Sequence, residues 1–238
     1  CYMDQEQEVF DWLMAPFSEE DRQCFGRFTE PSNSQHGKTL HQSLDTSILD
    51  LADDVAYGVH DLEDAVALRL FNREHWQEVH NSLDAGWASR MKLDLLEDQL
   101  FGGVSSSGHS RKQAVGGMVH ALIQSVELEK NSEFEEPLFS WNVILPEIPR
   151  RFLNALKASV SKNVIQLNTV QSATFRGHRM LVHIFEVLLE EAERLLPQRF
   201  GMEWKKAESE TQRYRVICDY MAGMTDQYAD RMYSRFFL

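Results

Sequence analysis

Apolar residues recur at helical spacing between positions 46 and 71 and predict one long, two-faced helix. Its core face comprises Ile48, Leu51, Ala52, Val55, Ala56, Val59, Leu62, Val66 and Leu70. The opposite arc comprises Asp50, Asp53, Asp54, Tyr57, His60, Asp61 and Asp64. Because Asp53, Tyr57 and Asp61 are spaced i, i+4, i+8, they stack along one side of the helix. We expect the rest of the chain to be organised around this segment.

The acidic arc has two interpretations. Charge runs usually face water. Like charges four residues apart repel each other, however, and no Lys or Arg interrupts the arc before Arg69. A bound divalent cation would offset that repulsion, and hard divalent metals prefer oxygen ligands. The arc is therefore either a solvated face or one wall of a metal site.

The remaining pattern predicts further helices joined by short polar loops. Helices are expected at about 4–14, 18–25, 72–87, 89–101, 110–128, 149–170, 174–196 and 208–237. Ser18, Asn72 and Ser110 are suitable N-caps for three of them. Loops are expected at 29–38, 102–110, 129–142 and 197–201. Only Trp141–Leu145 has a strand-like pattern. The predicted fold class is all-α, with about eight to ten helices.

Composition narrows the function classes. The 238 residues, 43% of them hydrophobic, are enough for one domain with a sizeable core. No apolar run approaches the ~20 residues of a membrane helix, and no signal peptide is evident. Three cysteines without metal-like spacing favour a reducing compartment, so we expect a cytoplasmic protein. The net charge of -13 disfavours broad nucleic-acid binding, although a local basic groove would allow it.

Three strings resemble one known family. LADDVAYGVHDLEDA (51–65) is similar to the last metal-ligand helix of the HD-domain deoxynucleoside triphosphate triphosphohydrolases, the dGTPase family. RVICDYMAGMTDQYADRMYSRFF (215–237) is similar to the closing helix of the bacterial dGTPase-like branch. CYMDQEQEVFDWLMAP (1–16) resembles a segment from the middle of such proteins. Since the first residue is Cys and not Met, we expect the chain to begin inside a longer polypeptide or to have been processed or cut.

The resemblance implies a multi-helix, HD-domain-like phosphohydrolase of which this chain is the C-terminal part. Residues 1–130 would complete the catalytic core, and residues 131–238 would form a C-terminal helical lobe. The implied reaction is metal-dependent hydrolysis of dGTP or related dNTPs to a deoxynucleoside and triphosphate, with Mg or Mn as the divalent metal. Members of the family form homo-oligomers. The family's other metal ligands, a His and a His-Asp pair, and its catalytic His would lie upstream, so the chain alone is expected to be inactive.

The resemblance also assigns site residues. Asp53 matches the metal-ligand Asp, and Tyr57 and Asp61 match residues that contact the nucleotide. His60-Asp61 is not the family's His-Asp signature, because the metal Asp precedes it when it should follow. The run His-Ser-Arg-Lys matches a helix start whose arginine contacts substrate phosphates, which would be Arg111 with Lys112 beside it.

One position departs from the family pattern. Vertebrate relatives place a Tyr eight residues after that arginine, where this chain has Val119 followed by His120. His120 is therefore included among the candidate substrate-binding residues, together with Tyr57, Asp61, Arg111 and Lys112.

Two other functions stay open from the residues alone. The chain could be a non-catalytic interaction or regulatory module whose acidic face docks a basic partner. It could also be a different metal-carboxylate protein, in which Glu97, Asp98 or the last helix would supply further ligands around Asp53. A basic cluster of Arg176, His178 and Arg179 either closes over phosphates or, as we favour, pairs with surface acids.

Overall fold

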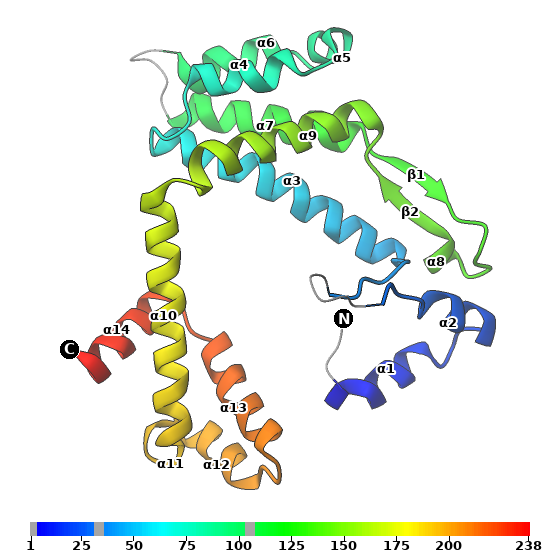
Figure 1. Cartoon of the computed structure of the whole chain (residues 1–238). Coiled ribbons are helices and arrows are strands. Elements are labelled where there is room, and N and C mark those ends of the chain that lie inside the picture. Colours follow the sequence, from blue (N-terminus) through cyan, green and yellow to red (C-terminus); the bar gives the residue numbers. More distant parts are fainter. Residues whose placement is uncertain (1–3, 31–35, 103–107) are drawn as a thin grey trace. The chain divides into compact units, whose positions relative to one another are not determined.

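The long helix predicted from the apolar periodicity is α3, Leu44–Ala67 (Figure 1). It begins two residues earlier than predicted, because the Ser43 side chain caps it by accepting a hydrogen bond from the backbone N–H of Thr46. It ends before Phe71, because Arg69 adopts a left-handed backbone conformation with φ of 59°. The Phe71 backbone then turns back and donates its N–H to the carbonyl of Ala65.

The computed structural model describes residues 4–30, 36–102 and 108–238, and these divide into two units, 1–164 and 165–238. The predicted subdivision at residue 130 falls between β1 (Glu127–Lys130) and β2 (Trp141–Ile144), which pair antiparallel within the first unit. That the whole chain folds as one domain stays a prediction.

Unit 1 is organised around α3. Its other elements are a 3-10 turn (Asp4–Glu6), α1 (Gln7–Met14), α2 (Glu19–Phe25), α4 (Arg73–Asn81), α5 (Ala85–Arg90), α6 (Leu93–Phe101), α7 (Gly108–Gln124), α8 (Pro137–Ser140), α9 (Glu147–Val160) and the two strands. Helices α7 and α9 and strand β2 all pack on α3 (Figure 1). A π-helical turn, Ser161–Ile165, follows α9.

The core of unit 1 lies under the apolar face of α3. Val59 and Leu62 are fully buried there, and the rings of Trp76, Trp87 and Phe152 pack nearby, with Phe152 in contact with both indoles. Ile48 was predicted on the core face, but it is 45% exposed because it borders an apolar hollow between α3 and α7. A smaller aromatic core of Phe134, Phe139 and Phe25 fixes α2 to the segment before β2.

Unit 2 is helical throughout and has its own core. It contains α10 (Asn168–Glu190), α11 (Ala192–Leu195), α12 (Gln198–Lys206), α13 (Glu210–Ala222) and α14 (Asp226–Phe237). Ile184, Leu188 and Ile217 are fully buried between α10 and α13.

The all-α prediction is confirmed, since the one sheet of the described residues has two short strands. Several boundaries were wrong. The single helix expected at 208–237 is broken at Gly223, and Thr225 caps α14 by accepting from the N–H of Tyr228. The loop expected at 197–201 lies mostly in α12. Ser110 is not an N-cap but lies inside α7, and residues 103–107 of the predicted connector are outside the described residues.

A second left-handed residue explains another missed boundary. The helix predicted at 89–101 begins only at Leu93, as α6, because Lys92 with φ of 56° separates α6 from α5. Strand β1 was missed because all four of its residues, ELEK, are exposed and show no period-two alternation.

Candidate functional site

The acidic side of α3 faces solvent, as its pattern predicts. Asp53 is exposed, Tyr57 is 50% exposed, and Asp61, one turn further on, is half-buried. These three side chains therefore lie along one accessible side of the helix, opposite the buried Val59 and Leu62. Their spacing on α3 is confirmed, and their predicted roles stay predictions.

Asp53 borders a polar hollow of about 280 Å³. The hollow lies where α3, β2 and α9 meet, and its lining comprises Gln42, Ser47, Asp50, Leu51, Asp53, Asp54, Val143 and Arg150. Ser47 fixes this corner, because its hydroxyl donates to the carbonyl of Leu44 and accepts the N–H of Val143 at 3.0 Å. Carboxylates and a guanidinium thus share one small cavity.

Two cations from α9 meet Asp54 beside Asp53. Arg150 Nη1 lies 3.0 Å from Asp54 Oδ2, and Lys157 Nζ lies 2.5 Å from Asp54 Oδ1. The three side chains are about one-third exposed. Water therefore reaches the site and screens both ion pairs. Asp54 therefore holds two positive charges next to the predicted metal ligand.

A close approach of two helices makes this arrangement possible. A Cβ atom at Gly58 would lie 2.7 Å from Leu153 Cδ1 and 3.2 Å from Lys157 Cγ, so a side chain there would push α9 away from α3. The short separation lets Lys157 extend along α3, with its Nζ 5.8 Å from the ring centroid of Tyr57. Lys157 thereby contacts both Asp54 and Tyr57.

Sequence reasoning missed Arg150 and Lys157. They are seven residues apart in α9 and so lie two turns apart on one helix face, which the sequence shows. The sequence does not show that this face crosses α3 at Gly58, because that depends on tertiary packing.

The predicted phosphate contacts, Arg111 and Lys112, lie in the first turn of α7. Figure 1 shows that α7 begins beside the C-terminal end of α3 and runs back along it. Arg111 is half-buried, and Lys112 and His120 are exposed. Val119, next to His120, borders the apolar hollow of about 560 Å³ between α3 and α7, together with His60. Within the described part of the chain, no hydrogen bond or ion pair joins Arg111, Lys112 or His120 to Asp53.

The alternative metal-carboxylate protein finds no support. Glu97 and Asp98 of α6 do not converge on Asp53 but pair with Arg73 of α4, with N–O distances of 2.7 and 3.4 Å. Among residues 4–30, 36–102 and 108–238, no three His, Cys, Asp or Glu ligand atoms gather at Asp53. A metal at Asp53 would need ligands from outside the described residues.

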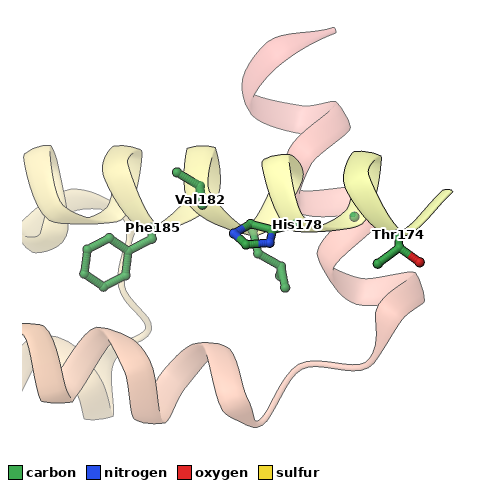
Figure 2. A pocket seen from close by; sticks show the side chains of 6 residues that line it. Thr174, His178, Val182 and Phe185 are labelled. Atoms are coloured by element: carbon green, nitrogen blue, oxygen red, sulfur yellow. The ribbon is translucent and has the colours of Figure 1, made fainter. Parts of the chain in front are cut away.

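Unit 2 carries a separate hollow of about 570 Å³ along one face of α10 (Figure 2). Thr174, His178, Val182 and Phe185 line it at helical spacing and point to the same side. Of the basic cluster predicted here, Arg179 contacts His183 of the same helix at 3.3 Å. Arg176 borders another hollow together with Asp226 and Asp230 of α14.

Comparison with known sequences shows which proteins the chain is similar to. Residues 143–235 match the family model described as a phosphohydrolase-associated domain. A deoxyguanosinetriphosphate triphosphohydrolase-like protein of Vibrio parahaemolyticus is 40% identical over 241 aligned residues, which cover 98% of this chain and 54% of the relative. Proteins of the same name from Aliivibrio salmonicida and Pasteurella multocida are 38% and 39% identical, covering 100% and 95% of this chain and 54% and 50% of theirs.

Over the half of these relatives that it spans, the chain is similar along nearly its whole length to dGTP triphosphohydrolase-like proteins. The resemblance expected from the three strings is thereby confirmed. The chain spans about half the length of the curated relatives it matches. None of the helices in the described ranges is both long enough and apolar enough to cross a bilayer.

Proposed function

We propose that this chain supplies part of a metal-dependent hydrolase that converts dGTP or related dNTPs to a deoxynucleoside and triphosphate. One observation carries the proposal: carboxylates suited to a hard divalent metal and cations suited to phosphate oxygens lie together where α3 and α9 cross. The names of the relatives, all dGTP triphosphohydrolase-like, support the same reaction class.

Each residue receives a role within this proposal. Asp53 would hold Mg or Mn, because its exposed carboxylate borders the polar hollow. The metal would polarise the phosphate under attack. Tyr57 and Asp61 would contact the nucleoside. Arg150 and Lys157 would bind triphosphate oxygens that the chain's net charge of -13 otherwise repels.

The predicted contacts from α7 are retained as a second group. Arg111 and Lys112 would approach the phosphates, and His120 would contact the substrate, if the ligand extends along α3 toward the start of α7. A cytoplasmic location and homo-oligomeric assembly also belong to the proposal.

The test is triphosphate release from dGTP with Mg or Mn, using the complete gene product and its Asp53→Ala variant. We expect the activity of the variant to fall at least ~100-fold while its circular dichroism is unchanged. Loss of a metal ligand should lower activity more than loss of a residue that only orients a ligand. The matched control is Asp64→Ala, an exposed carboxylate about 16 Å further along the same helix face.

The 238-residue chain is assayed in parallel and should release no triphosphate, because Asp53 alone cannot hold the metal. Release by the chain alone contradicts that expectation. Equal activity of Asp53→Ala and the parent contradicts the metal role. If the gene product neither hydrolyses dGTP nor is stabilised by metal and nucleotide, the interaction module with an acidic docking face becomes the better reading.

A further inference from the structure

Three potential metal ligands from outside α3 meet in unit 1. They are Cys24 of α2, His41 in the segment before α3, and Glu133 in the loop after β1. Their ligand atoms all lie within 4.8 Å of one another. Cys24 Sγ is 3.9 Å from His41 Nε2 and 3.7 Å from Glu133 Oε2.

These separations match the edges of a tetrahedral zinc site. With Zn–S of about 2.3 Å and Zn–N or Zn–O of about 2.1 Å, ligand atoms at tetrahedral angles stand about 3.6 Å apart. The two measured separations exceed that value by only a few tenths of an ångström. A thiolate and an imidazole favour zinc over magnesium or calcium, which prefer oxygen ligands.

A cation already occupies the centre of the triad. Arg27 Nη2 lies 2.8 Å from Cys24 Sγ and 3.0 Å from His41 Nε2, and it also donates to Glu133. Since a guanidinium nitrogen can only donate, His41 Nε2 accepts and directs its lone pair inward. His41 therefore directs an acceptor nitrogen, the kind of atom that binds a metal, toward the centre.

The ion pair between Arg27 and Glu133 shifts the pKa of both side chains. Hydrogen bonding to Glu133 and then to Cys24 raises the pKa of Arg27 above its usual value. The hydrogen bond from Arg27 lowers the pKa of the Glu133 carboxyl.

The segments that carry the ligands are held together by contacts independent of the triad. The buried carboxylate of Asp21 accepts the backbone N–H groups of Glu135 and Glu136, at 3.2 and 3.0 Å, and so fixes the loop of Glu133 against α2. The Leu40 N–H donates to the Arg27 carbonyl at 3.0 Å, which places His41 beside α2.

The imidazole is oriented by packing. The His41 ring stands edge-on to Phe134, with centroids 4.9 Å apart and an interplanar angle of 86°. Phe134 is itself buried in the small aromatic core. The ligands are thus preorganised from three separate segments, as a structural or regulatory metal site requires.

We propose that Cys24, His41 and Glu133 form a Zn²⁺ site in which the metal replaces the Arg27 guanidinium and water completes the tetrahedron. Arg27 acts as the resident cation of the metal-free chain. Zinc binding releases the Cys24 thiol proton and frees Arg27 to solvent.

The test measures Zn²⁺ binding to the metal-free 238-residue chain with a competing chromogenic chelator. Cys1 and Cys218 are replaced by Ser so that Cys24 is the sole thiol. We expect one Zn²⁺ per chain, at least ~10-fold weaker binding for Cys24→Ser and for His41→Ala, and a thiolate-to-cobalt charge-transfer band when Co²⁺ is used.

Arg27→Gln distinguishes a metal site from an ion-pair network. The variant should bind Zn²⁺ more tightly than the parent because the competing cation is gone. The control Arg22→Gln, on the helix that carries Cys24, should bind as the parent does. Circular dichroism checks that each variant is folded. Equal Zn²⁺ affinity for the parent, Cys24→Ser and His41→Ala, or no cobalt–thiolate band, would show that Arg27 only closes an ion-pair network.

Discussion

Lys157 Nζ lies 2.5 Å from Asp54 Oδ1 and thereby joins α9 to α3 one residue away from the proposed metal ligand. Arg150 binds the other oxygen of the same carboxylate. One aspartate thus binds two cations, and one of them, Arg150, lines the hollow that Asp53 borders. The ion pairs of Asp54 are expected to contribute both to stability and to substrate binding. Separate experiments measure the two contributions.

Lys157→Met keeps most of the aliphatic stem and removes the charge. We expect the free energy of unfolding to fall by about 1 kcal/mol, because a partly exposed ion pair with good geometry is lost. Urea unfolding measures the difference. Lys162→Met is the matched control, since its pair with Glu78 is more exposed and should contribute less than about 0.5 kcal/mol. Equal losses in both variants would contradict a special role for Asp54.

Arg150→Ala in the complete gene product should lower kcat/KM for dGTP by at least ~10-fold, mainly through KM, because a phosphate contact is removed. Steady-state triphosphate release measures both constants. The neighbouring Arg151 is a close control: it is exposed and pairs with Glu147 within α9, so Arg151→Ala should leave kcat/KM unchanged. If both variants behave alike, Arg150 does not bind the substrate.

Gly58→Ala should destabilise the protein even though alanine favours helices. The new methyl would meet Leu153 at 2.7 Å, and such overpacking costs about 1–3 kcal/mol, which exceeds the helix-propensity gain. Gly116→Ala in α7 is the control, because no atom lies within 4 Å of its added Cβ. That variant should gain up to about 1 kcal/mol in chemical unfolding. A stabilised Gly58→Ala would mean that α3 and α9 separate easily.

Asp21→Ala should lower the free energy of unfolding by about 2 kcal/mol, because the N–H groups of Glu135 and Glu136 lose a charged acceptor. It should also weaken Zn²⁺ binding, since the loop of Glu133 is no longer fixed to α2. Glu20→Ala, exposed on the same helix, should change neither property. If Asp21→Ala is destabilised but binds Zn²⁺ as tightly as the parent, then Asp21 does not position Glu133 for the metal.

Stability at alkaline pH should depend on Tyr220. Burial, and then a hydroxyl–hydroxyl bond to Tyr228 at 3.0 Å, raise the pKa of Tyr220 above its model-compound value of 10.0. The unfolded chain therefore loses this proton first, so the stabilisation is complete below about pH 10 and is lost as pH rises toward the folded pKa. Urea unfolding above pH 10 should show a steeper decline for the parent than for Tyr220→Phe. If the stability of the parent and of Tyr220→Phe falls equally above pH 10, then Tyr220 does not cause the decline.

The sequence predicts what is local in this fold. The period of α3 places Val59 inside and Asp53 outside without reference to any other segment. Long-range relationships were not predictable: the crossing of α9 at Gly58, which brings Lys157 to Asp54, depends on packing between residues about 100 positions apart. The meeting of Cys24 with Glu133, whose separation in sequence is 109, was missed for the same reason. A strand such as β1, exposed at every position, gives no periodic signal.

Arg69 and Lys92 have left-handed backbone conformations, which are unfavourable for residues other than glycine and asparagine. The protein could therefore be made more stable at these two positions. A side chain with a Cβ atom costs about 1–2 kcal/mol in this conformation, and glycine or asparagine avoids most of that cost. Arg69 lies between α3 and α4 and Lys92 between α5 and α6, and neither is among the residues assigned to substrate or zinc. Replacing Arg69 or Lys92 by glycine could therefore offset the loss of stability caused by a substitution at Asp53 or Asp54. Site variants that would otherwise unfold could then be purified and assayed.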